Sequence, residues 1–203
     1  MRITAILVAT LTLALTAVSA SRAVASEPQQ VDLACVIMQG DHQAAATRKS
    51  PLDSVSFKVA GGEVKVCYGR PSVRGRKIFG AELVPYGKVW RTGANEPSMI
   101  HTSVPLQVGD IRIEPGTYSL YTVPGESEWQ IIVNRSTEQW GIESQYTAEV
   151  QAQELGRVTV PAEQTDQPVE TFTIRAVPKG SGSVDLVLEW ERTRVAVPLK
   201  AAG

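Results

Sequence analysis

A cluster of basic side chains is the feature of this sequence that could do chemistry. Between residues 70 and 91 the chain has six basic residues and one acidic residue, a local balance of +5. The basic residues are Arg70, Arg74, Arg76, Lys77, Lys88 and Arg91, and the acidic residue is Glu82. Clustered guanidinium groups combine fork-shaped donors with a positive field, which suits carboxylate, phosphate or sulfate groups. The cluster therefore predicts a site for an anionic partner.

The predicted site includes neighbours of these cations. Tyr86 and Trp90 offer flat surfaces that could stack on a sugar ring, and Asn95 offers directional hydrogen bonds. The partner would be an anionic small molecule, a glycan or an acidic protein surface. The predicted ligand-binding residues are Arg74, Arg76, Lys77, Tyr86, Trp90, Arg91, Asn95 and Glu96. A second interpretation stays open, in which the charges decorate a solvated loop or Arg91 and Glu96 form ion pairs that hold the loop against the sheets.

Motifs for catalysis are mostly absent from the sequence. It has no Gly-x-Ser-x-Gly elbow, no phosphate-binding Gly-rich loop, no dinucleotide fingerprint and no His-Glu-x-x-His zinc motif. Glu82, Glu96, Asp110 and Glu114 could supply the paired carboxylates of a glycosidase, but nothing in the sequence fixes their separation. We therefore expect a non-enzymatic binding module, with two alternatives: a carbohydrate- or ester-directed hydrolase that uses Glu96, or a structural subunit of an envelope assembly. No cofactor and no catalytic residue are predicted.

Histidine and cysteine are too scarce to predict a metal site. The chain has two histidines, His42 and His101, and two cysteines, Cys35 and Cys67, which are 32 residues apart. In an oxidising compartment the cysteines could form a bridge that stabilises the fold by ~3 kcal/mol. Alternatively, both are separate thiols and Cys67 is packed in the interior of a strand. The sequence leaves both states open.

Short β-strands are the elements that must position these residues. Residues 55–59 and 64–68 alternate apolar and polar side chains around Gly61-Gly62, which predicts a hairpin. Further strands are expected at 99–104, 111–113, 117–123, 129–133, 155–160, 172–177, 184–190 and 195–197. This pattern predicts an all-β fold, an antiparallel β-sandwich or flattened barrel. One long Gly/Pro-rich basic loop, residues 70–98, interrupts it.

Three smaller expectations accompany this fold. Alternate residues, such as Trp129, Ile131 and Val133, should form the core. Residues 136–150 could hold a short helix. Tyr118 should close a corner of the sandwich through a hydrogen bond of its phenol group.

The N-terminus has the layout of a secretory signal. Arg2 precedes an apolar run, and small residues that a signal peptidase accepts lie before Ser26 and before Ser21. We expect residues 1–25 to be a signal peptide, 26–50 an N-terminal tether and 51–200 a single all-β domain. The protein would then be periplasmic or secreted, with no membrane span after cleavage. An uncleaved anchor over residues 3–20 is the alternative.

The overall charge excludes one class of partner. The formal net charge is -1, with 20 basic and 21 acidic residues. Proteins that bind nucleic acid through their whole surface are usually strongly basic. No nucleic-acid partner is therefore expected.

Several segments together resemble one family. They are 75–80 (Gly-Arg-Lys-Ile-Phe-Gly), 83–96 with its string Val-Trp-Arg-Thr-Gly-Ala-Asn-Glu, 115–125 and 139–141. They look like the bacterial family catalogued as domain of unknown function 2911, over about residues 50–199. The resemblance implies an exported bacterial protein with a single all-β domain. It implies no reaction, cofactor or ligand, because none is established for the family.

Overall fold

The fold is built almost entirely from antiparallel β-strands. The computed structural model describes residues 31–180 and 182–202. Within them, nine strands form one sheet, and three short helical segments lie outside it. The strands are β1 (Leu52–Val59), β2 (Gly62–Gly69), β3 (Ser98–Thr102), β4 (Leu106–Val108), β5 (Ile111–Ile113), β6 (Gly116–Pro124), β7 (Glu128–Asn134), β8 (Glu154–Pro178) and β9 (Ser183–Ala201). The helical segments are α1 (His42–Ala46), the 3-10 turn η1 (Glu143–Gln145) and α2 (Ala148–Gln151).

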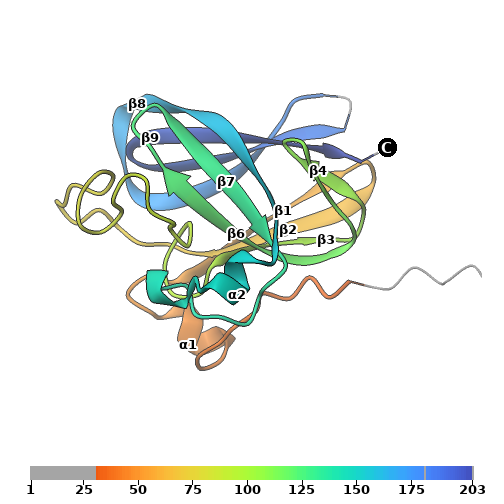
Figure 1. Cartoon of the computed structure of the whole chain (residues 1–203), viewed down its shortest axis with the longest axis horizontal. Helices are drawn as coiled ribbons and strands as arrows, with labels where there is room; N and C mark the ends of the chain where they lie inside the picture. Colours follow the sequence, from red (N-terminus) through yellow and green to blue (C-terminus); the bar gives the residue numbers. More distant parts are fainter. Residues whose placement is uncertain (1–30, 181, 203) are drawn as a thin grey trace, which may run out of the picture.

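The sheet folds over so that its two parts face each other. Its strand order is β1-β2-β3-β6-β7-β8-β9-β4-β5, and it is not closed into a barrel. The first part of β8 pairs with β7 and the rest pairs with β9. Although β1 is not next to β8 or β9 in the sheet, it contacts both of them. Figure 1 shows β8 and β9 as two long neighbouring ribbons at the top of the view, with the basic loop projecting on the left.

One continuous apolar core lies between the two parts of the sheet. Trp129, Ile131 and Val133 of β7 are buried, as their alternation predicted. They pack in one cluster with residues of β8 and β9, including Phe172 and Trp190. The predicted all-β fold, a flattened antiparallel sandwich, is confirmed.

Two pairs of predicted strands are single long strands. Residues 155–160 and 172–177 both belong to β8, and residues 184–190 and 195–197 both belong to β9. The register between these strands shifts twice, between Gln164 and Val169 and between Val169 and Thr173. Such irregularities bend a strand without ending it. The break in apolar alternation is therefore a bend and not a turn.

The smaller expectations also have clear outcomes. The hydroxyl of Tyr118 donates to the carbonyl of Glu114 at 3.1 Å, a hydrogen bond to backbone four residues earlier. The helical part of 136–150 is limited to η1 and to α2, which Thr147 caps by accepting from the Val150 amide. Short polar helices of this kind depend on their caps and on packing.

Residues 31–50 are held against the domain. A disulfide joins Cys35 to Cys67 of β2. Of the two states that the sequence left open, the bridge is confirmed and the pair of separate thiols is wrong. Helix α1 follows, with Asp41 accepting from the Ala44 amide as its N-cap. The predicted signal peptide lies outside the described residues. No helix of the described ranges is long and apolar enough to cross a membrane.

Candidate functional site

A tight turn sets the direction of two arginines in the basic loop. Arg74 and Gly75 both have left-handed backbone, with φ of 51° and 70°, and the Arg76 amide donates to the Val73 carbonyl at 3.1 Å. Two consecutive left-handed residues are typical of a type I′ turn. Gly75 adopts this conformation without strain, whereas an arginine seldom does. The backbone at Arg74 is thus held in a costly conformation that presents its side chain.

Backbone and apolar contacts hold the loop in place. The Val73 amide donates to the Glu170 carbonyl at 2.7 Å, and Trp90 and Thr122 exchange two backbone hydrogen bonds at 2.7 and 2.9 Å. The rings of Phe79 and Trp90 pack in the aromatic core, Trp90 stacking on Trp190 at 5.9 Å between centroids. Arg70 adds an ion pair with Asp53 at 3.1 Å. The anchors do not use the charge of Arg74 or Arg76, so the loop is fixed without these two guanidinium groups.

A cavity of about 380 Å³ opens beside this turn. Its wall combines residues from the end of the N-terminal segment, from the loop and from β9. They are Lys49, Ser50, Pro71, Ser72, Arg74, Arg76, Leu83, Trp90, Arg91, Gly93, Ala94 and Trp190, and we call this cavity the basic pocket. Every charged residue in this lining is basic. Trp90, Trp190 and Leu83 provide an apolar part of the wall.

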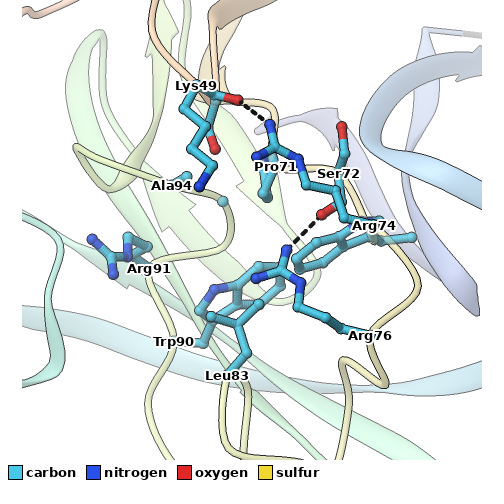
Figure 2. A pocket seen from close by; sticks show the side chains of 12 residues that line it. Lys49, Pro71, Ser72, Arg74, Arg76, Leu83, Trp90, Arg91 and Ala94 are labelled. Carbon is cyan, nitrogen blue, oxygen red and sulfur yellow. Dashed lines mark hydrogen bonds between the residues drawn. The ribbon is translucent and has the colours of Figure 1, made fainter.

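Three cationic groups face the basic pocket. Figure 2 shows the side chains of Lys49, Arg74 and Arg76 around the space above Trp90, with Arg74 reaching toward the Lys49 carbonyl and Arg76 toward the Ser72 carbonyl. Arg74 Nη2 donates to the Lys49 carbonyl at 3.0 Å, and Arg76 donates from Nε to Val73 O at 2.9 Å and from Nη2 to Ser72 O at 2.7 Å. Among the described residues no carboxylate forms an ion pair with any of the three. The three side chains are exposed and form no ion pair, although the carboxylate of Glu170 accepts from the backbone amide of Arg74 at 2.9 Å.

Arg91 lines the pocket differently. Its guanidinium points away from Lys49 and Arg74 in Figure 2, and Nη1 donates to the Asn95 carbonyl at 3.1 Å. Gly141 lies directly against its stem, because a Cβ there would be 2.7 Å from Arg91 Cδ. Burial lowers the pKa of the Arg91 guanidinium. Arg91 therefore contributes to the wall with its stem and directs its charge into the protein.

Four other predicted residues lie outside the basic pocket. Lys77 and Tyr86 are exposed, and the ring of Tyr86 lies against Gly80. The amide of Asn95 donates to the Ser50 carbonyl at 2.9 Å. Glu96 is 5% exposed and accepts from Arg48 at 2.7 Å and from the Met38 amide at 3.0 Å. Glu96 thus forms its ion pair with Arg48. The interpretation in which Glu96 and Arg91 hold the loop against the sheets is wrong for this pair.

Sequence reasoning missed part of the pocket wall. Lys49 fell inside the predicted tether, where nothing in the composition connects it to residues 70–98. Ser72 and Leu83 lay within the loop but carried no charge that drew attention. Trp190 lay in an expected strand, 184–190, and was not predicted to line a site. The pair of basic residues Arg48-Lys49 was a weak signal, because it lies about twenty residues before the basic cluster.

Groups for acid–base or metal chemistry do not gather in the described ranges. No set of three His, Cys, Asp or Glu side chains there could hold a metal ion. Glu96 is taken up by Arg48, and Glu114 forms an exposed pair with Arg112 at 2.8 Å. His101 is buried and its Nδ1 hydrogen-bonds Thr117 at 2.9 Å. The arrangement can bind an anion, and it brings no pair of carboxylates to the basic pocket.

A family of known sequences matches most of this structure. The model of a family described as protein of unknown function, DUF2911, matches residues 50–199. This range begins directly after Lys49 and includes the basic loop and the sheet except for the last two residues of β9. No curated protein and no solved structure matches the chain. With most of its 203 residues matched, the chain belongs to the DUF2911 family of proteins of unknown function.

Proposed function

We propose that this protein is an exported, non-enzymatic module of the bacterial cell envelope that binds a small anionic ligand in the basic pocket. The observation that carries the proposal is the set of three cationic groups, on Lys49, Arg74 and Arg76, that face one cavity without a carboxylate partner. Like charges around one space repel each other, and an anion between them removes that cost.

The strained backbone at Arg74 supports the same proposal. A left-handed conformation costs a non-glycine residue about 1–2 kcal/mol, and Gly or Asn would avoid this cost. Such strain often occurs at functional sites, and Arg74 is one of five non-glycine residues with left-handed backbone in the described ranges. Export is supported by the signal-like residues 1–25 and by the Cys35–Cys67 bridge, since disulfides persist in oxidising compartments.

The test is a thermal-shift screen of the purified, oxidised protein against phosphate, sulfate, citrate and anionic sugars at low and moderate salt. A ligand at about 100 times its dissociation constant should stabilise the fold by about 2.7 kcal/mol. Arg74→Ala and Arg76→Ala should each abolish the shift, and added salt should weaken it.

Two further variants serve as matched controls. Arg192 also donates to a backbone carbonyl, that of Asp166, and lies outside the basic pocket, so Arg192→Ala should leave the shift unchanged. Arg91→Ala should lower the melting temperature and retain ligand binding, because its guanidinium points away from the cavity. If no anion stabilises the protein, the proposal is wrong and a structural subunit becomes the better reading.

A further inference from the structure

We infer that the anion of the basic pocket is a phosphate monoester whose organic part packs on the apolar wall. This inference rests on the proposed function and narrows it to one ligand class. It follows from the number and direction of the hydrogen-bond donors, from the summed charge of the three cations, and from the apolar part of the pocket wall.

The donors outnumber what a carboxylate can use. A guanidinium has five N–H donors and a lysine ammonium has three. Within the described residues Arg74 uses one side-chain donor and Arg76 uses two, all of them to backbone carbonyls, and Lys49 uses none. Two carbonyl bonds hold the guanidinium of Arg76, one holds that of Arg74, and the remaining N–H groups of both are left for a ligand. Donors that converge from several directions fit the three terminal oxygens of a phosphate better than the two coplanar oxygens of a carboxylate.

Charge favours the same choice. The three groups that face the pocket carry a summed charge of +3, with Arg91 nearby on the wall. A phosphate monoester carries about −1.5 to −2 charges at pH 7, whereas a carboxylate carries one. The more highly charged anion gains more in the same field.

The remaining lining requires an organic part. A cavity of about 380 Å³ falls within the size range of pockets that hold organic ligands, which is roughly 300–1,000 Å³. Pro71, Leu83, Trp90 and Trp190 supply apolar wall that inorganic phosphate would leave in contact with water. Leu83 is 48% exposed at the mouth of the cavity. Its side chain is thus placed to cover the organic part of a bound ester.

The test compares matched probes by calorimetry on the purified protein. Phenyl phosphate has an aromatic ring and a phosphate, benzoate has the ring with a carboxylate, and inorganic phosphate has no ring. The three probes therefore separate the contribution of the anionic group from that of the ring. Phenyl phosphate should bind roughly tenfold more tightly than either of the others. Leu83→Ser, a change at an exposed site, should weaken phenyl phosphate several-fold and leave inorganic phosphate unchanged. The affinity should also rise several-fold from pH 5 to pH 7.5, because the second pKa of a phosphate monoester is about 6.

Two further binding measurements distinguish two sources of such an ester. Glycerol 3-phosphate represents a soluble metabolite, and vesicles containing phosphatidic acid represent a lipid headgroup. Binding of either one supports the inference and names the source. If benzoate binds as tightly as phenyl phosphate, or if the affinity does not change with pH, the inference is wrong while the proposed anion site stands. If no probe binds, the inference is wrong, and the proposed anion site is wrong as well if no anion of the thermal-shift screen stabilises the protein.

Discussion

The guanidinium of Arg48 lies 2.7 Å from the carboxylate of Glu96, and only 17% and 6% of the two side chains are exposed. This ion pair joins the N-terminal segment to the end of the basic loop. The Asn95 amide reaches the Ser50 carbonyl beside it, and Arg74 reaches the Lys49 carbonyl. The end of the segment 31–50 is therefore fixed so that Lys49 and Ser50 form one side of the basic pocket, and Glu96 acts as an anchor beside it.

Removal of Arg48 should destabilise the protein strongly. Arg48→Ala leaves the buried Glu96 carboxylate with the Met38 amide as its remaining partner. We expect the free energy of unfolding to fall by about 2–4 kcal/mol, because a buried charge then lacks its counter-charge. Urea unfolding followed by circular dichroism measures the loss.

Lys179→Ala provides the comparison for this prediction. Lys179 pairs with Asp185 at 3.2 Å, but its side chain is 58% exposed. An exposed pair contributes about 0–1 kcal/mol. Equal losses in the two variants would show that Arg48 contributes no more than a surface ion pair.

The disulfide should be a second anchor of the same segment. It closes a loop with a sequence separation of 32 residues. Chain-entropy arguments give about 3–4 kcal/mol for a loop of this length. Cys35→Ala/Cys67→Ala should lower the free energy of unfolding by that amount, measured against the oxidised parent. A reducing agent should lower the stability of the parent equally and leave that of the double variant unchanged; any other result contradicts the prediction.

The sequence predicted those parts of the fold that local periodicity encodes. Trp129, Ile131 and Val133 were identified as core because alternation places them on one face of a strand. The continuity of β8 and β9 was missed, because a bulge interrupts alternation in the same way as a turn does. The pattern within one strand cannot distinguish a bulge from a turn, because a register shift depends on the partner strand.

The candidate site shows a similar limit. Counting charges located Arg74, Arg76 and Arg91 in one loop, but charge does not encode side-chain direction. The turn at Arg74 and Gly75 turns two of these side chains toward the cavity, and packing against Gly141 turns Arg91 away. Lys49 was missed because its place depends on the bond between Asn95 and Ser50, which are 45 residues apart.

A close backbone approach behind the pocket gives a third prediction. A Cβ on Gly69 would lie 2.1 Å from the carbonyl oxygen of Ala94, which cannot move without its turn. Gly69→Ala should therefore cost at least about 3 kcal/mol of stability. At Gly156 the nearest atom is 3.1 Å away and belongs to the flexible side chain of Ile111, so Gly156→Ala should cost about 1 kcal/mol or less. Thermal unfolding of both variants checks the order, and a smaller loss at Gly69 would contradict it.

The buried His101 should make stability depend on pH. Burial, together with the charge of Lys65 on the neighbouring strand, lowers its pKa from 6.5 to about 4, although Asp32 acts in the opposite direction. Thr117 holds Nδ1 at 2.9 Å, and the ring is fully buried. The folded protein thus keeps this imidazole neutral at a pH where the unfolded chain takes up a proton.

The sign follows from this difference. The contribution of His101 is fully present above pH 6.5 and is lost as the pH falls from there to about 4, by up to about 3 kcal/mol. Urea unfolding between pH 4 and 7.5 should show this loss in the parent and a smaller one in His101→Gln. His42→Gln, at an exposed histidine, should retain the slope of the parent. If His101→Gln does not fold, NMR titration of the histidine rings in the parent decides the matter. A His101 ring that titrates near pH 6.5 in the folded protein contradicts the prediction. Its pKa would then be the same in the folded and unfolded states, and stability would not depend on its protonation.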